Sequence, residues 1–296
     1  MGRAGTLVQP GAPGFMSWDP GGLGHDTWAA RTSGMMSPVA RSGPPVGGRP
    51  GSGSANPPGA ALTLTRVTWR ASQADDTSAA QGVSLHMPPG QSAALHSEPP
   101  GDATELLDIV AGLRRPRSGR VTVDEVAVDG LSGPALDRYR AGRGLLSARF
   151  PLLPSLSVTD NVLAALPPGR IDAATRERAA QLLAVTGAAR LAGPAGALPA
   201  GQQWRILIAR ALLPGPRLVL AEDPAPGLDS RSATAVLDLL MDVHARFGFT
   251  LLLTVDRLAS ASRCQRLVRL AGGALVGDEL TGGDDPWTRG RIDRIG

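Results

Sequence analysis

Two neighbouring acids, Glu222 and Asp223, follow the apolar run 218–221, which is short enough to be a strand buried on both faces. Upstream, Gly201 and Gln202 open an amphipathic helical pattern. The start of a helix offers backbone N–H groups to an anion, and carboxylates at a strand end are suitable ligands for a divalent cation. The pattern therefore predicts a phosphate and metal site within residues 198–230.

The same stretch resembles the part of ATP-binding-cassette (ABC) ATPases that runs from the LSGGQ signature to the acidic pair. The corresponding letters are LPAGQ at 198–202, EDP at 222–224 and GLDS at 227–230. The resemblance implies an α/β fold of the ABC-type P-loop NTPase class, with an antiparallel β subdomain and a helical signature subdomain. It also implies ATP and Mg²⁺ as cofactors, a homo- or heterodimer with another ABC ATPase, and a membrane permease as partner on the cytoplasmic face of the plasma membrane.

The order of the acids is inverted relative to the family. Glu222 stands where the family has the Asp that holds Mg²⁺, and Asp223 stands where it has the catalytic Glu. Aspartate is one methylene shorter, so its carboxylate falls short of a water that must lie within about 2.6–3.2 Å of its base. The resemblance assigns Gly201 and Gln202 to the signature and Asp229 to the dimer turn, and we expect impaired catalysis at Asp223.

The phosphate loop of the family, G-x-x-G-x-G-K-S-T, aligns with residues 97–105, SEPPGDATE. Glycines in this loop allow backbone N–H groups to converge on the phosphates, and its lysine neutralises them. All three aligned glycines are replaced, with Gly101 standing at a variable position. Ala103 replaces the lysine, and Thr104 aligns with the hydroxyl that binds Mg²⁺. The two prolines at 99–100 have no N–H to donate. We therefore expect this degenerate loop to bind ATP weakly or not at all.

Three further positions complete the resemblance. Trp69 is a candidate for stacking on adenine, although the family's aromatic position aligns more closely with Ala71, and a core tryptophan explains it equally well. Ala148 replaces a glutamine that touches Mg²⁺, and Val255 replaces a histidine that contacts the γ-phosphate. The apolar frame around each position is kept.

Several elements must position these residues. We predict strands at 61–70, at two places within 82–97, as a pair in 120–130, and at 144–147, 218–221, 249–254 and 265–270. The first three strands together resemble the antiparallel subdomain of the family. We predict helices at 105–113, 134–139, 173–185 and 229–246, one opening at Gly201, and one capped by Ser157 or Thr159.

The totals narrow the class of protein. Residues 1–59 are rich in Gly, Pro and Ser and predict a disordered extension, followed by a nucleotide-binding domain at 60–280, with a helical subdomain at about 150–212, and a tail at 281–296. No run approaches the roughly 18–20 apolar residues that span a bilayer. All 30 basic residues are arginine, but they are dispersed and aromatic residues are scarce, so nucleic-acid binding is not favoured. The single cysteine, Cys264, is expected to be buried.

The leading hypothesis is a degenerate ABC subunit that docks a permease and pairs with an active partner ATPase. Two alternatives remain at this point. One is a functional ATPase that drives transport through Glu222 and Asp223. The other is a cytosolic noncatalytic scaffold.

Overall fold

The computed structural model describes residues 59–69, 82–98, 101–224 and 227–281. The chain divides into two units, Met1–Ser52 and Gly53–Gly296, and every described residue belongs to the second. Apart from Gly59 and Thr281, the predicted extension and tail lie outside the described residues. No helix within the described ranges is long and apolar enough to cross a membrane.

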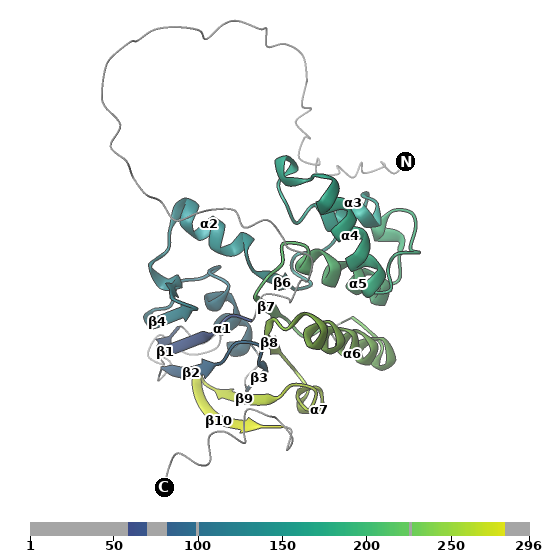
Figure 1. The fold of residues 1–296 in the computed structure, drawn as a ribbon. Coiled ribbons are helices and arrows are strands. Elements are labelled where there is room, and N and C mark those ends of the chain that lie inside the picture. The colour runs from purple at the N-terminus through teal and green to yellow at the C-terminus, as the bar shows by residue number, and fades with distance from the viewer. Residues whose placement is uncertain (1–58, 70–81, 99–100, 225–226, 282–296) are drawn as a thin grey trace, which may run out of the picture. The chain divides into compact units, whose positions relative to one another are not determined.

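A six-stranded sheet forms the centre of the described unit, in the order β10-β9-β3-β8-β7-β6 (Figure 1). Its strands are β3 (Ser92–Glu98), β6 (Gly144–Leu146), β7 (Leu218–Ala221), β8 (Thr250–Thr254), β9 (Arg266–Ala271) and β10 (Ala274–Leu280). All neighbours are parallel except β10, which pairs antiparallel with β9 at one edge. Every residue of β7 and β8 is buried, as expected for parallel strands covered on both faces.

An antiparallel sheet lies beside it in the order β2-β1-β4-β5. Its strands are β1 (Leu62–Thr68), β2 (Val83–Met87), β4 (Ser118–Val123) and β5 (Val126–Ala127). A bulge between Leu64 and Val67 places Arg66 at φ 47°. Gly119 pairs close to this bulge with φ 87°, and a Cβ there would lie 2.2 Å from the Arg66 carbonyl oxygen. Only glycine fits at that crossing.

Two sequence predictions are corrected by the structure. The third predicted strand, β3, belongs to the parallel sheet and not to the antiparallel subdomain, because it pairs with β8 and β9. Its consecutive buried residues 92–95 already fit a strand with both faces covered. The helix predicted at 105–113 is α1 (Asp102–Val110), which starts and ends three residues earlier. It ends there because Gly112 turns the chain with φ 70°.

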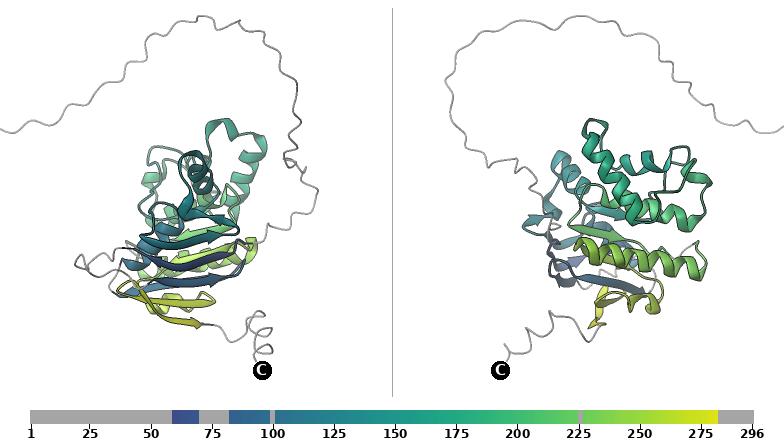
Figure 2. Two further views of the ribbon diagram at one scale, coloured as in Figure 1. Left: turned by 90° about the vertical axis from the view of Figure 1, so that its left-hand side faces the viewer. Right: turned by 45° about the vertical axis from the view of Figure 1, so that its right-hand side comes forward.

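Three helices form the helical subdomain, together with the loops between them: α3 (Val158–Leu163), α4 (Ala173–Val185) and α5 (Ala200–Leu212). Figure 2 shows them grouped to one side of the central sheet. Ser157 caps α3, since its Oγ accepts a hydrogen bond from the Asp160 N–H at 3.1 Å. The buried faces of all three helices share one apolar cluster that includes Trp204 of α5 and continues onto the central sheet.

The remaining helices are α2 (Gly133–Ala141), α6 (Ser230–Phe247) and α7 (Leu258–Ala261), with 3₁₀ turns at Val128–Gly130, Pro168–Arg170 and Ala195–Ala197. The 18-residue helix α6 begins at its cap Asp229 and stops at Gly248, which adopts φ 69°. A second apolar cluster joins α1 and the antiparallel sheet to the other face of the central sheet. Cys264 is buried, as predicted, just after α7.

Candidate functional site

The candidate site residues follow the carboxyl ends of parallel strands. Ser147 follows β6, Glu222 and Asp223 follow β7, and Val255 follows β8. Because these strands are parallel neighbours, their carboxyl ends meet at one edge of the sheet, where α/β folds place their sites. The Glu222 N–H donates to the Leu146 carbonyl at 2.8 Å. The hydrogen bonding between β6 and β7 therefore extends to the first residue of the acidic pair.

Glu222 is held by two side chains from the loop after β6. The Ser147 hydroxyl donates to Glu222 Oε2, and Arg149 Nη2 donates to Glu222 Oε1. The same guanidinium donates from Nη1 to Asp108 Oδ2 at 3.0 Å and from Nη2 to Asp108 Oδ1 at 2.6 Å. Arg149 therefore joins a carboxylate of α1 to the carboxylate that follows β7.

The charges in this cluster are unequally exposed. The side chains of Asp108 and Glu222 are 10% and 14% exposed, whereas that of Arg149 is 43% exposed. The hydrogen bond to Asp108 raises the pKa of Arg149, partial burial lowers it, and the hydrogen bond to Glu222 raises it, for a net upward shift. The guanidinium is thus charged throughout the accessible pH range and balances two largely buried acids.

Asp223 points to a different partner. Its N–H donates to Thr254 Oγ1 at 3.1 Å, and its Oδ2 accepts the Asp256 N–H at 2.9 Å. The residue is 7% exposed. The carboxylate thus stabilises the turn after β8. In the inverted pair, Glu222 accepts a hydrogen bond from the Arg149 side chain, and Asp223 accepts one from a backbone N–H. Val255 beside it is buried, and its carbonyl contacts His96 Nδ1 at 3.0 Å.

The start of α1 shows how the aligned phosphate loop is arranged. Gly101 caps the helix with φ 116°. The Ala103 N–H, at the position of the lysine, donates to Ser97 Oγ at 3.1 Å. Asp102 is fully buried and accepts the Gly273 N–H at 2.7 Å.

Thr104 lies half-buried in the first turn of α1, while Glu222 contacts Ser147 and Arg149. Mg²⁺ binding by Thr104 and Glu222 remains a prediction. Within the described ranges, no three His, Cys, Asp or Glu side chains gather in a metal-binding group. The two prolines 99–100 lie outside the described residues.

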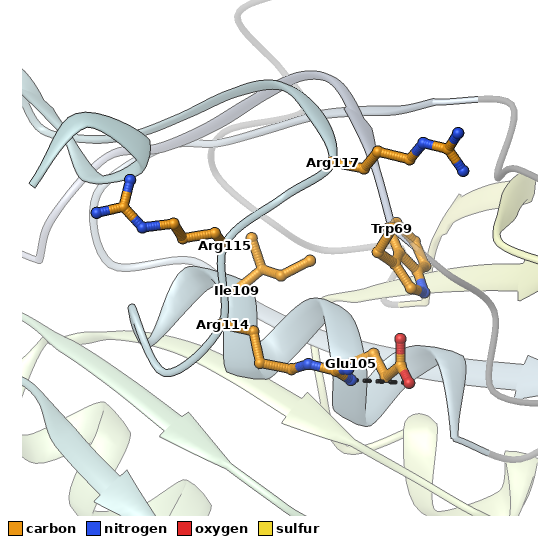
Figure 3. Close-up of a pocket in the computed structure, with 6 residues that line it drawn as sticks. All are labelled: Trp69, Glu105, Ile109, Arg114, Arg115 and Arg117. Carbon is orange, nitrogen blue, oxygen red and sulfur yellow. Dashed lines mark ion pairs between the residues drawn. The ribbon is translucent and has the colours of Figure 1, made fainter.

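Trp69 lines a cavity of about 450 Å³ beside α1, shown in Figure 3. Trp69 is 3% exposed, and its Nε1 has no hydrogen-bond partner among the residues that the structure describes. Glu105 and Ile109 face it from α1, and Glu105 Oε1 pairs with Arg114 Nη1 at 2.8 Å. The side chains of Arg115 and Arg117 complete the lining and point away from one another. Adenine stacking at Trp69 remains a prediction.

The predicted signature residues and dimer turn lie together. Gly201 and Gln202 occupy the first turn of α5, after Pro199, which has no side-chain cap bond. A Cβ placed on Gly201 would lie 3.6 Å from Ser232 Cβ. Asp229 Oδ1 accepts the Ser232 N–H at 3.0 Å. The helix starts that carry Gly201 and Asp229 are thus neighbours.

Two residues of the cluster were not found by sequence reasoning. Arg149 follows Ala148, which stands where the family has its glutamine, and no family motif includes Arg149. Asp108 lies within a predicted helix. A signal existed: Asp108 lies on the otherwise apolar run Leu106–Val110, all of it buried. Because burying an unpaired charge is costly, a carboxylate at such a position predicts a cationic partner.

The comparisons with known proteins agree with this geometry. A family profile described as "ABC transporter" matches residues 80–226. The lipoprotein-releasing system ATP-binding protein LolD 1 of Caulobacter vibrioides is 36% identical over 206 residues, which cover 68% of this chain and 88% of that protein. The chain belongs to the ABC transporter ATP-binding family. It follows that the chain is the ATP-binding-cassette subunit of an ABC transporter.

Other relatives of this cassette act in different directions of transport. The phosphonates import ATP-binding protein PhnC of Rhizobium etli is 34% identical, covering 68% of this cassette and 75% of that protein. The macrolide export ATP-binding/permease protein MacB of Burkholderia thailandensis is also 34% identical, but the match covers only 34% of its length. Among solved structures, the dimeric ATP-binding cassette MJ0796 bound to ADP and Pi matches with a TM-score of 0.65 and 26% identity, covering 75% of this chain and all of that one. The predicted ABC-type α/β fold with its antiparallel subdomain is thereby confirmed.

Proposed function

We propose that this cassette is a noncatalytic subunit of an ABC transporter, with weak or absent ATP binding, that docks a permease and pairs with an active ATPase. The family uses the residues after β7 for ATP hydrolysis. We infer that in this cassette they hold the structure together instead. The observation that carries it is the state of Glu222, whose two carboxylate oxygens accept hydrogen bonds from Ser147 and Arg149.

A Mg²⁺ ion at Glu222 would have to compete with a guanidinium that already neutralises this carboxylate. Hydrogen bonds to charged groups contribute about 1.5–3 kcal/mol each, and removing one partner of a buried pair leaves an uncompensated charge. We infer that Glu222 does not fit the role of a metal ligand while Arg149 is present. Asp223, the next residue, is also engaged, since its Oδ2 accepts the Asp256 N–H.

The phosphate side supports the same inference. The Ala103 N–H, which a phosphate would need, is given to Ser97 Oγ, and no lysine exists in the chain. Asp102 and Glu105 stand in the first turn of α1. Each unit charge about 4 Å from a phosphate changes its energy by roughly 4 kcal/mol at an effective dielectric constant of about 20. Loss of the lysine attraction alone therefore removes about half of the roughly 8 kcal/mol that a micromolar affinity represents. Glu105 adds little repulsion, because its Oε1 pairs with Arg114.

The docking role rests on an apolar loop beside the site. Phe150 and Leu153 are 41% and 49% exposed, although both are large apolar side chains. We take these two side chains, close together in one short segment, as an interaction surface. We assign it to a permease, which would place the cassette peripherally on the cytoplasmic face of the plasma membrane. The likeness to LolD 1 and MacB favours a permease of the exporter or lipoprotein-release type.

The pairing role rests on the retained signature. Gly201, Gln202 and Asp229 lie at two neighbouring helix starts, where backbone N–H groups and the helix dipole favour an anion. In a heterodimer these residues would face ATP bound by the active partner. The solved structure of MJ0796 is a dimer, which is consistent with pairing of cassettes of this kind.

Phosphate release from ATP and Mg²⁺ by the purified chain tests the noncatalytic assignment. We expect the wild type and Asp223→Asn to give the same background rate, because this carboxylate is engaged by backbone. A wild-type rate that falls at least about tenfold in Asp223→Asn would identify a working ATPase instead. Recovery of the chain from cells only in the cytosolic fraction, with a permease gene expressed beside it, would favour a scaffold and contradict the docking role.

A further inference from the structure

Residues 147–153, here called the docking loop, carry the exposed Phe150 and Leu153. The loop leaves the central sheet at the end of β6 and leads toward the helical subdomain at α3. It therefore connects the candidate site to the surface proposed for the permease. Its conformation decides where the two apolar side chains stand.

One end of the docking loop is tied to the site by charge. The Arg149 guanidinium contacts Asp108 of α1 through two hydrogen bonds and Glu222 after β7 through a third. The backbone of Arg149 is fixed as well, since its N–H donates to Ser147 Oγ at 3.0 Å. Two elements far apart in the sequence are thus connected through one side chain of the loop.

The other end is tied to the helical subdomain by hydrogen bonds to the loop backbone, without an ion pair. Arg210 of α5 donates to the carbonyls of Phe150 and, at 2.8 Å, of Pro151. Asn161 of α3 accepts the Leu153 N–H at 2.7 Å and donates to the Leu153 carbonyl at 3.0 Å. Arg149 is the one residue of the docking loop whose side chain forms an ion pair in the described structure.

The charges explain why this contact is strong. Asp108 and Glu222 are two acids with little solvent around them, and without a cation they would repel each other and lose hydration. The planar guanidinium reaches both, and its paired bonds to Asp108 fix its orientation as well as its position. A cation supplied by the chain therefore stands between the carboxylates of α1 and β7.

We propose that Arg149 is a positioning residue for permease docking, a resident cation that holds the docking loop in one conformation without nucleotide or metal. The identity of the docked partner rests on the function proposed above, whereas the holding of the loop concerns the isolated chain. In this cassette the apolar surface is then preformed and does not depend on events at a phosphate site.

Hydrogen exchange of the docking-loop amides tests the proposal in the full chain. In the wild type, we expect the protection of residues 149, 150 and 153 to be the same with EDTA, with MgCl₂ alone and with MgCl₂ and ATP. In Arg149→Ala, we expect these amides to exchange about tenfold faster or more, since several charge-assisted hydrogen bonds are lost. Amides of β7 and β8 serve as the internal reference and should change little.

Two variants separate positioning from general stability. Arg149→Lys keeps the charge but not the paired geometry, and should restore part of the protection. Arg176→Ala removes an exposed arginine of α4 and should leave the docking loop as in the wild type. If Arg149→Ala does not fold, the lysine variant carries the comparison alone and should still exchange faster than the wild type.

Docking-loop exchange in Arg149→Ala within twofold of the wild type, or in Arg149→Lys where the alanine variant does not fold, would overturn the proposal. A rise in wild-type protection of about tenfold on adding MgCl₂ alone would overturn it too, because the loop would then depend on a metal. These results are independent of ATP turnover. The noncatalytic assignment can therefore fail while Arg149 still holds the loop, and the reverse also applies.

Discussion

Asn161 anchors the docking loop to the helical subdomain, and its replacement should lower the free energy of unfolding. The side chain is fully buried in α3. Its Oδ1 accepts the Leu153 N–H, and its Nδ2 donates to the carbonyls of Leu153, Leu156 and Ser157 at 3.0, 3.3 and 3.0 Å. The carbonyls of Leu153 and Leu156 have further donors, from Leu156 and Ala195, whereas the Leu153 N–H has Asn161 as its partner.

The cost of Asn161→Ala can be worked out from these contacts. Leaving the part-buried Leu153 N–H without a partner costs about 1–3 kcal/mol, and loss of the amide donor adds about 1 kcal/mol. We therefore expect the free energy of unfolding to fall by about 2–4 kcal/mol. This cost should not depend on pH, because neither side chain titrates.

Asn161→Asp has nearly the same shape but a different charge. The acid keeps the acceptor for the Leu153 N–H, yet its second oxygen faces three carbonyls, so its pKa should rise in the folded state. Holding an aspartate neutral at pH 7, about three units above its ordinary pKa of about 3.9, costs about 4 kcal/mol. Near pH 4.5 the same cost is only about 1 kcal/mol.

The sign of this pH dependence is fixed by linkage. Because the folded pKa is raised, the unfolded chain loses its proton first, and stability is lost as pH rises above about 3.9 toward the folded pKa. Urea unfolding followed by tryptophan fluorescence should show Asp to be at least as harmful as Ala at pH 7, and less harmful near pH 4.5. A difference between the two variants that does not change with pH would refute the assigned hydrogen bonds.

Three further outcomes are expected. Burial lowers the pKa of His244 below its ordinary 6.5, and its hydrogen bond to Gly90 has a weaker, opposite effect. The unfolded chain therefore binds the proton first, and stability is lost as pH falls below about 6.5. The free energy of unfolding in urea, measured at about pH 7.5 and about pH 5.5, should change less with pH in His244→Gln than in the wild type, and an equal change would contradict this. Burial raises the pKa of the Cys264 thiol to about 12; the native protein should react with a thiol reagent at least about tenfold more slowly than in urea, and equal rates would contradict its burial. Phe150→Asp should reduce the fraction of the cassette that co-sediments with membranes containing its permease. Val276→Asp on β10 should not, although Val276 is 58% exposed against 41% for Phe150, and a matching loss in both would contradict a specific docking loop.

Local patterns predicted several elements closely. The apolar run at 218–221 is β7, and the predicted helix 173–185 is α4 with the same bounds. Both depend on residues close in sequence: four consecutive apolar side chains in the first, and Asp172 as cap of the second. The cap at Asp229 of α6 and the cap at Ser157 of α3 are of the same kind.

Features set by distant residues were not predicted. The sheet that β3 joins depends on β8 and β9, which follow more than a hundred residues later. The contacts of Arg149 reach 41 residues back to Asp108 and 73 residues forward to Glu222. No periodicity encodes such pairs, and the strand order that brings them together is a property of the whole sheet. Alignment to the family identifies the replaced lysine, glutamine and histidine. The contacts of Arg149 with Asp108 and Glu222 are seen only in the structure.

Titration of the purified chain with a fluorescent ATP analogue and Mg²⁺ tests the central claim most directly. The matched control is a variant in which residues 97–105 carry an intact phosphate loop with its glycines and lysine. We predict no saturable binding by the wild type at micromolar concentrations and restored binding by the repaired variant. Comparable binding by both would contradict the claim, because the native loop would then hold a nucleotide despite Ala103 and its bond to Ser97.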